Sequence, residues 1–266
     1  MVPAATPTGP RPGPRPEPRL LLLFDIDGTL LQRAAIEHGR ALREAAAGVH
    51  GIPPLDGLRV EFAGRTDAAI VRDLLVLAGV AGDEADARWP EVMDAAVAAY
   101  ESLCPADLSK AVAPGVPELL AALAERPETF RLSLVTGNLQ PIARRKLANA
   151  GIGGYFEAGQ GGFGSDHLDR DELPPIARAR AGDWPRERTV VVGDTPRDIA
   201  CARSDSLRVA AVATGPFAIE ALADADAVVD DARALLPVLE DFSRGCPTGH
   251  RSIRNGPLGG APATSC

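Results

Sequence analysis

The stretch LLLLFDIDGTL at residues 20–30 begins with five apolar residues and continues into two aspartates. A short apolar run that ends at a charged residue is typical of a strand buried on both faces of a parallel sheet. Asp25 and Asp27 stand two positions apart, so in a strand their carboxylates point to the same side, where a divalent cation would offset their repulsion. Gly28 permits the positive φ of a sharp turn. The stretch therefore predicts a strand that brings paired carboxylates to one end of a sheet, although the motif also occurs in calcium loops and ordinary turns.

Short apolar runs bounded by turn residues recur along the chain, and helical patterns alternate with them. This alternation predicts an α/β fold with a Rossmann-like parallel sheet. The predicted strands are residues 20–24, 131–135, 189–192, 208–213 and 227–229, and the predicted helices are residues 115–125, 139–150, 172–181, 197–204, 217–223 and 231–241.

The alternation stops between residues 33 and 111, where three helical patterns occur without a convincing strand, at 33–47, 67–78 and 84–103. This stretch is predicted to be an all-helical insertion after the first strand. Ligands of open α/β sheets bind beyond the carboxyl ends of the strands, so an insertion that leaves from there would cover the site as a cap. The predicted domains are an α/β core at residues 20–32 and 112–243, a helical cap at 33–111, a disordered Pro/Arg-rich arm at 1–19 and a disordered tail at 244–266.

The composition limits the classes of protein to which the chain can belong. Of its 266 residues 45% are hydrophobic, which is enough for a folded core, and no apolar run approaches the roughly 18 residues of a membrane span. The formal net charge of −8 disfavours binding to nucleic acid or to an anionic membrane. The four cysteines show no CxxC spacing and the sequence has no signal-peptide pattern, so we expect a reduced, cytoplasmic protein.

Two further motifs stand at the ends of other predicted strands. LVTGN at residues 134–138 brings a hydroxyl and free backbone N–H groups to a helix start, which can cradle a phosphate but is also a common helix cap. VVVGDTPRD at residues 190–198 contains Asp194 directly after an apolar run, where a metal ligand at the sheet edge is expected. Asp198 either orients that loop or is an acid favoured by the first turn of a helix.

The three motifs, in this order and each at a strand end, resemble the haloacid dehalogenase (HAD) superfamily of aspartate-nucleophile hydrolases. The resemblance covers roughly residues 20–240, and the insertion is similar to the small helical cap of phosphoglycolate-phosphatase-like members. It implies a Mg²⁺-dependent phosphatase that hydrolyses a small phosphate monoester through an aspartyl-phosphate intermediate.

The resemblance also implies roles for individual residues. Asp25 would be the nucleophile, and Asp27 would be the general acid/base, which needs a raised pKa if it is to be protonated near neutral pH. Both would bind the metal, Asp27 through its backbone carbonyl. Asp194 would complete the Mg²⁺ site, with Asp198 in support. The transferring phosphoryl group would be bound by Thr136, with Gly137 and Asn138 beside it.

The family also uses a basic residue, usually lysine, to hold nucleophile and phosphate together, and here the chain lacks the expected Lys-Pro motif. Arg170 stands 24 residues before Asp194, about where the family lysine falls, and a guanidinium can bridge a carboxylate and a phosphate. Lys146, within a predicted helix, is the competitor for this role. In the cap, Arg65 either contacts a substrate anion or is a solvated surface residue, and Thr66 is a predicted N-cap.

Other functions share parts of this pattern. A sugar phosphomutase uses the same core chemistry and differs in how its cap excludes water. A non-hydrolytic phospho-acceptor or binding protein also holds Mg²⁺ with strand-end carboxylates, but the helical cap and the Asp-x-Asp spacing disfavour it. Haloacid dehalogenation is disfavoured because it requires neither Asp27 nor Asp194. We expect a monomer or homodimer whose partner is a small phosphorylated metabolite, not nucleic acid or membrane.

Overall fold

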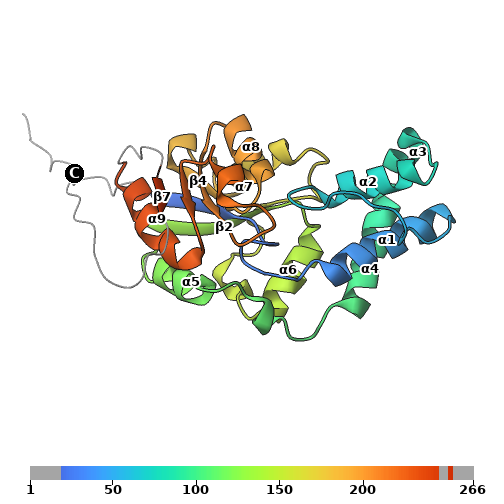
Figure 1. Cartoon of the computed structure of the whole chain (residues 1–266), viewed down its shortest axis with the longest axis horizontal. Helices are drawn as coiled ribbons and strands as arrows, with labels where there is room; N and C mark the ends of the chain where they lie inside the picture. Colours follow the sequence, from blue (N-terminus) through green and yellow to red (C-terminus); the bar gives the residue numbers. More distant parts are fainter. Residues whose placement is uncertain (1–18, 246–250, 254–266) are drawn as a thin grey trace, which may run out of the picture.

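The computed structural model describes residues 19–245 and 251–253, which form a parallel sheet with helices on both faces (Figure 1). The sheet has seven strands in the order β3-β2-β1-β4-β5-β6-β7, and each adjacent pair is parallel. The central strand β1 (Leu20–Phe24) lies between β2 (Phe130–Thr136) and β4 (Thr189–Gly193). The other strands are β3 (Gly162–Phe163), β5 (Arg208–Val212), β6 (Ala227–Val229) and β7 (Arg251–Ile253).

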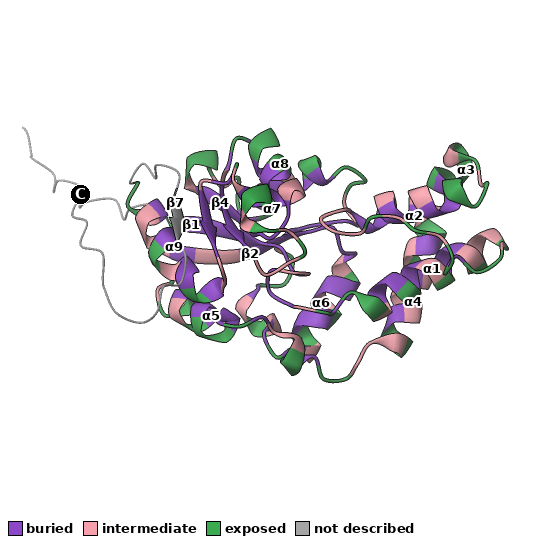
Figure 2. Cartoon of the chain, in the orientation of Figure 1, coloured by how far each residue is buried: buried purple, intermediate pink, exposed green. Residues whose placement is uncertain are grey.

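Five α-helices of the described core bury their apolar sides against the sheet and expose their polar sides (Figure 2). Three of them contribute side chains to a hydrophobic cluster on one face of the sheet, and the other two contribute to a cluster on the opposite face. The first three are α5 (Val116–Ala124), α6 (Gln140–Asn149) and α9 (Leu235–Ser243), and the other two are α7 (Leu173–Arg180) and α8 (Pro196–Ser204).

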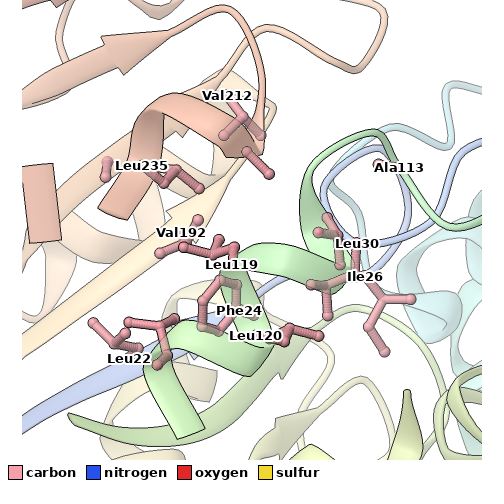
Figure 3. Close-up of a cluster of buried hydrophobic side chains, with 14 of the residues drawn as sticks. Leu22, Phe24, Ile26, Leu30, Ala113, Leu119, Leu120, Val192, Val212 and Leu235 are labelled. Carbon is pink, nitrogen blue, oxygen red and sulfur yellow. The ribbon is translucent and has the colours of Figure 1, made fainter. Parts of the chain in front are cut away.

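Strand β1 is buried at every position because its successive side chains enter the two clusters in turn. Leu22 and Phe24 belong to the first cluster, whereas Leu21 and Leu23 belong to the second. Figure 3 shows part of the first cluster, in which Phe24 lies beside the leucines of α5. Burial on both faces explains why the sequence of β1 is an uninterrupted apolar run and not an alternating one.

Between β1 and β2 the chain forms a bundle of helices that extends away from the sheet (Figure 1). The bundle has its own hydrophobic cluster, which includes Leu139 and Ile142, so it packs on the core through helix α6. The predicted helix at 84–103 is interrupted at Arg88. The first helix begins later than predicted, because Arg33 has a left-handed φ of 58° that cannot continue into a helix. The helices of this bundle, which we call the cap from here on, are α1 (Ile36–His50), α2 (Asp67–Leu77), α3 (Gly82–Ala87) and α4 (Trp89–Leu103).

The structure confirms the predicted α/β class with a parallel, Rossmann-like sheet. The five predicted strands all form, and their ends lie within one residue of the predicted bounds. Strands β3 and β7 are not predicted, because two or three residues are too few for a recognisable apolar run. The predicted helix at 217–223 is a short 3₁₀ turn at Ile219–Leu222.

The two predicted disordered segments, residues 1–19 and 244–266, lie mostly outside the described residues. The prediction for the second segment does not hold at Arg251–Ile253, because the edge of β6 pairs with these residues to form β7. Within the described part of the chain, no helix has the length and apolar character needed to cross a membrane.

Candidate active site

Three strand ends meet at one edge of the sheet. Because β1 lies between β2 and β4 and all three strands are parallel, Asp25, Thr136 and Asp194 emerge side by side. Carboxylate oxygens of Asp25, Asp194 and Asp198 lie within 4.8 Å of one another, and all three residues are buried. Asp25 and Asp194 line a cavity of about 580 Å³ whose other walls come from the cap and its connections. The strand ends and the cap therefore enclose a space for a ligand.

Asp194 has the features of a ligand to a divalent cation. Its Oδ1 accepts a hydrogen bond from the Thr29 hydroxyl at 3.0 Å, but its Oδ2 is buried without a partner among the described residues. Burial and the charges of nearby carboxylates raise the pKa of Asp194 to about 9. The pKa of Asp25 is raised to about 7, chiefly by burial. A cation would bind the unpartnered oxygen and offset the repulsion, and a set of carboxylate oxygens suits Mg²⁺.

Two glycines allow the Asp194 carboxylate to fit at the sheet edge. A Cβ atom at Gly28 would lie 2.1 Å from Oδ2 of Asp194, and a Cβ atom at Gly215 would lie 1.7 Å from the same oxygen. Gly28 also has a positive φ of 93°, as the sequence predicts for the turn after β1. Both positions therefore have to be glycine for Asp194 to keep its place.

Arg170 lies against the predicted nucleophile. It is buried in a short 3₁₀ turn before α7, and its Nη2 donates to Oδ1 of Asp25 at 3.0 Å and to Oδ1 of Asp198 at 2.5 Å. Its Nε is buried without a hydrogen-bond partner among the described residues. Arg170 is thus the basic residue in contact with Asp25, at the position where the sequence predicts one.

Asp198 fills both of the roles that the sequence leaves open. Its Oδ2 accepts hydrogen bonds from the backbone N–H and the hydroxyl of Thr195, and the Thr195 hydroxyl in turn accepts from the Asp198 N–H, which completes a capping box at the start of α8. The same carboxylate also accepts from the Asp194 N–H and binds Arg170. Because these donors occupy its oxygens, Asp198 orients the loop and Arg170 and is a poorer candidate for a metal ligand than Asp194.

Lys146 contacts Asp27 and not Asp25. It lies on α6 with no exposed surface, and its Nζ donates to the two carboxylate oxygens of Asp27 at 2.8 and 2.6 Å. Burial alone would raise the pKa of Asp27, but the charge of Lys146 and the hydrogen bonds from Lys146 and Asn138 outweigh it, so this pKa lies below its usual value. The predicted raised pKa of Asp27 is therefore wrong for this arrangement, and the reason is the buried ammonium group beside it.

In the loop after β2, more polar groups already have hydrogen-bond partners than the sequence predicts. Asn138 donates through Nδ2 to Asp27 at 2.9 Å and to the Thr136 hydroxyl at 3.1 Å. The predicted free N–H groups at the start of α6 are partly engaged, because the Leu139 N–H donates to Oδ2 of Asp67 and the next N–H along donates to a serine hydroxyl. A phosphate can therefore use fewer of these N–H groups than the motif suggests.

The cap comes close to this loop at Gly137. A Cβ atom there would lie 1.9 Å from the carbonyl oxygen of Arg65, and the Gly137 carbonyl accepts from the Asp67 N–H at 2.8 Å. The Arg65 guanidinium forms an ion pair with Asp73 at 2.8 Å and donates to backbone carbonyls, so the group predicted to contact a substrate anion already has partners. Thr66 caps α2, as predicted, by accepting from the Ala69 N–H.

Two residues near Asp27 are absent from the sequence prediction. His38 on α1 and Asp67 at the start of α2 both belong to the cap, and both are buried. The sequence contains one signal for this cluster. In the predicted helix at 139–150, Lys146 falls on the same stripe as the apolar Ile142 and Ala143, where an unpaired charge would be costly.

Comparisons with known proteins agree with this geometry. The sequence model of the haloacid dehalogenase-like hydrolase family matches residues 22–203, a range that contains Asp25 and Asp27 and both of the other motifs. An N-acetylmuramic acid 6-phosphate phosphatase of Pseudomonas aeruginosa is 30% identical over a region that covers 82% of this chain and 94% of the relative. A plasmid-encoded phosphoglycolate phosphatase of Cupriavidus necator is 32% identical over 82% of this chain and 92% of the relative.

Solved structures share the fold at lower identity. A β-phosphoglucomutase from Clostridium difficile is 16% identical with a TM-score of 0.62, covering 85% of this chain and 98% of that one. A predicted phosphatase from Clostridium acetobutylicum is 18% identical with a TM-score of 0.61, covering 84% and 99%. The match to the family and the two full-length relatives establish that the chain belongs to the haloacid dehalogenase-like hydrolases and groups with their phosphatases, enzymes that hydrolyse phosphate monoesters.

Proposed function

We propose that the protein is a Mg²⁺-dependent phosphatase that transfers the phosphoryl group of a small metabolite to Asp25 and then to water. The observation that supports this most is the buried group formed by Asp25, Asp194 and Arg170. It combines an unpartnered carboxylate oxygen with a guanidinium that already contacts the nucleophile. Such a group suits an anionic substrate, because a phosphate monoester repels a carboxylate unless cations lie beside both.

The first step uses Asp25 and Asp27. A carboxylate oxygen of Asp25 attacks phosphorus, the bond from phosphorus to the leaving oxygen breaks, and an aspartyl-phosphate forms. Arg170 is placed to bind the oxygens of the transferring group while it contacts Asp25. Asp25, Asp194 and the Asp27 carbonyl would hold Mg²⁺, which would supply positive charge to stabilise the phosphoryl oxygens.

Asp27 would act as the acid and then as the base. It gives a proton to the leaving oxygen in the first step and takes one from the water that hydrolyses the aspartyl-phosphate in the second. The lowered pKa of Asp27 describes the site before substrate binds. A phosphate dianion bound beside Asp27 would raise that pKa, because a neighbouring like charge disfavours the ionised form.

The cavity sets the size of the substrate. A volume of about 580 Å³ is in the range of small-molecule sites and includes apolar wall residues such as Phe62 and Ile70. The names of the two full-length relatives give two phosphate esters of organic acids, N-acetylmuramic acid 6-phosphate and phosphoglycolate, and both belong in the first substrate panel. A phosphomutase is the weaker candidate, because its likeness to this chain is at 16% identity and concerns the fold alone.

The proposal is tested by phosphate release from a panel of alkyl, sugar and aryl phosphates, with Mg²⁺ and with EDTA. We expect turnover of at least one ester that needs Mg²⁺, and loss of about 10³-fold or more in Asp25→Asn, which cannot form the acyl phosphate. Trapping of ³²P on the wild-type protein, but not on Asp25→Asn, checks the intermediate. Metal-independent turnover, or full activity of Asp25→Asn, would overturn the proposal.

A further inference from the structure

A continuous chain of hydrogen bonds joins the cap to Asp27. Oδ2 of Asp67 lies 2.9 Å from Nε2 of His38, and Nδ1 of His38 lies 3.2 Å from Nζ of Lys146. The same Nζ contacts both carboxylate oxygens of Asp27. His38 and Asp67 come from the cap and Lys146 from the core, and all three are almost fully buried. The cap and the core are thus connected through side chains that end at the predicted acid/base.

The donors and acceptors in this chain are consistent from end to end. An ionised Asp67 only accepts hydrogen bonds, so the proton of His38 is on Nε2 and the lone pair of Nδ1 faces Lys146. The Lys146 ammonium has three N–H donors, and its three partners are Asp27, Asn138 and His38. Each ammonium proton therefore has an acceptor.

The cap holds His38 firmly in this place. Oδ2 of Asp67 also accepts from the Leu139 N–H, and the Asp67 N–H donates to Gly137, so Asp67 is bound to the core at two points. The imidazole of His38 packs edge-on against Tyr100, with ring centroids 5.7 Å apart. His38 can take this position only while the cap rests on the core.

We infer that His38 and Asp67 are positioning residues: by fixing Lys146, they hold the Asp27 carboxylate in its acid/base position when the cap is docked. The inference rests on the proposed function. The mechanism needs no covalent step of these residues, since His38 acts only by accepting from Lys146 and donating to Asp67. A buried lysine without the histidine acceptor would have one unsatisfied donor and would be free to move away from Asp27.

The leaving group shows whether Asp27 is well placed. An alkyl phosphate releases a strongly basic alkoxide that needs the proton of Asp27, whereas p-nitrophenyl phosphate releases a stable phenolate that does not. The value of kcat/KM reports only the steps up to phosphoryl transfer, so it isolates the acid step from hydrolysis of the intermediate. A misplaced Asp27 should therefore slow the alkyl ester selectively, whereas general damage to the fold would slow both esters equally.

The experiment compares His38→Phe with His38→Gln, using the best alkyl ester of the panel and p-nitrophenyl phosphate. A glutamine is long enough to donate to Asp67 and accept from Lys146, whereas a phenylalanine keeps a ring of similar size but can neither accept nor donate. We expect the ratio of alkyl to aryl kcat/KM to fall about tenfold or more in His38→Phe, up to the 10²–10⁴-fold worth of general acid catalysis, and to recover in His38→Gln.

Two matched controls should leave the ratio unchanged. His50 ends the same helix as His38, and its imidazole is buried without a hydrogen-bond partner among the described residues, so His50→Phe makes the same change away from the site. Arg145 is next to Lys146 but pairs with Glu101 at the surface, so Arg145→Met removes a cation from the same helix. An unchanged or increased ratio in His38→Phe, or equal behaviour of the two His38 variants, overturns the inference. A wild-type protein that hydrolyses neither ester overturns the proposed function instead.

Discussion

The ammonium group of Lys146 lies within 2.8 Å of both carboxylate oxygens of Asp27, although 119 residues separate the two in the chain. The neighbouring aspartate has a different partner, because Asp25 binds Arg170. Each carboxylate of the Asp-x-Asp pair therefore has its own cation. In the proposed function this arrangement would separate two tasks, namely binding of the phosphoryl group beside the nucleophile and placement of the acid/base.

The two cations should affect phosphate binding differently. Arg170 adjoins Asp25, the proposed nucleophile, where a phosphate would bind, so Arg170→Gln should weaken inhibition by inorganic phosphate by about tenfold or more, the worth of one hydrogen bond to a charged group. In Lys146→Met the inhibition constant should stay within about threefold, because the ammonium is used by Asp27, Asn138 and His38.

Steady-state inhibition assays on both variants check this pair of expectations. Arg180→Gln is the matched control, because Arg180 forms an ion pair with Asp166 and belongs to the same segment as Arg170 but does not line the cavity. If Lys146→Met loses phosphate affinity and Arg170→Gln keeps it, the roles are reversed and Lys146 is the phosphate-binding residue.

The part of the site that follows from strand order could be predicted from the sequence. The apolar runs before Asp25 and Asp194 can be recognised from neighbouring residues alone. Parallel strands then bring their carboxyl ends to one edge of the sheet, independently of how the cap packs. The capping residues Thr66 and Thr195 are likewise predictable, because a cap depends on the next three residues only.

The part of the site that depends on how the cap docks on the core could not be predicted. His38 and Asp67 lie on helices whose pattern fixes their structure but not their orientation towards α6. The contact between Lys146 and Asp27 depends on that same docking and on the rotation of α6 about its axis. These are long-range relationships, and a single sequence contains only the indirect signal of a lysine on an apolar stripe.

A methyl group at Gly215 should weaken metal binding without changing the fold. The Cβ atom of Gly215→Ala would lie 1.7 Å from Oδ2 of Asp194, so this carboxylate has to move away from the position where it would face a bound cation. We expect the Mg²⁺ concentration for half-maximal activity to rise about tenfold or more, the effect typical of disturbing the support of a metal ligand.

Titration of activity with MgCl₂ measures this change. Gly154→Ala is the control, because the added Cβ would have no atom within 4 Å outside residues 153–155, and it should leave the Mg²⁺ requirement as it is. A Gly215→Ala variant with normal Mg²⁺ dependence would show that Asp194 is not a metal ligand.

The buried carboxylates should make the metal-free protein less stable as the pH rises. In the folded state the pKa of Asp25 is raised from 3.8 to about 7 and that of Asp194 from 3.8 to about 9, so between about pH 4 and pH 7 the folded state binds more protons than the unfolded state. The free energy of unfolding therefore falls with rising pH across this window. The lowered pKa of Asp27 has the opposite effect on stability, but only at a pH near or below 3.8. It therefore does not affect the comparison above pH 5.

Thermal unfolding at pH 5 and pH 8, in EDTA and in MgCl₂, tests this relationship. In EDTA the Tm should be lower at pH 8 by roughly 5 °C, and MgCl₂ should raise the Tm more at pH 8 than at pH 5, because a divalent cation favours the ionised carboxylates. In the double variant Asp25→Asn/Asp194→Asn neither side chain titrates, so both the fall in EDTA and the gain from MgCl₂ should shrink, and what remains belongs to other groups. A Tm that rises between pH 5 and pH 8 in EDTA would mean that ionisation of these two aspartates does not destabilise the fold. A Mg²⁺ effect that the double variant retains in full would mean that the cation binds elsewhere.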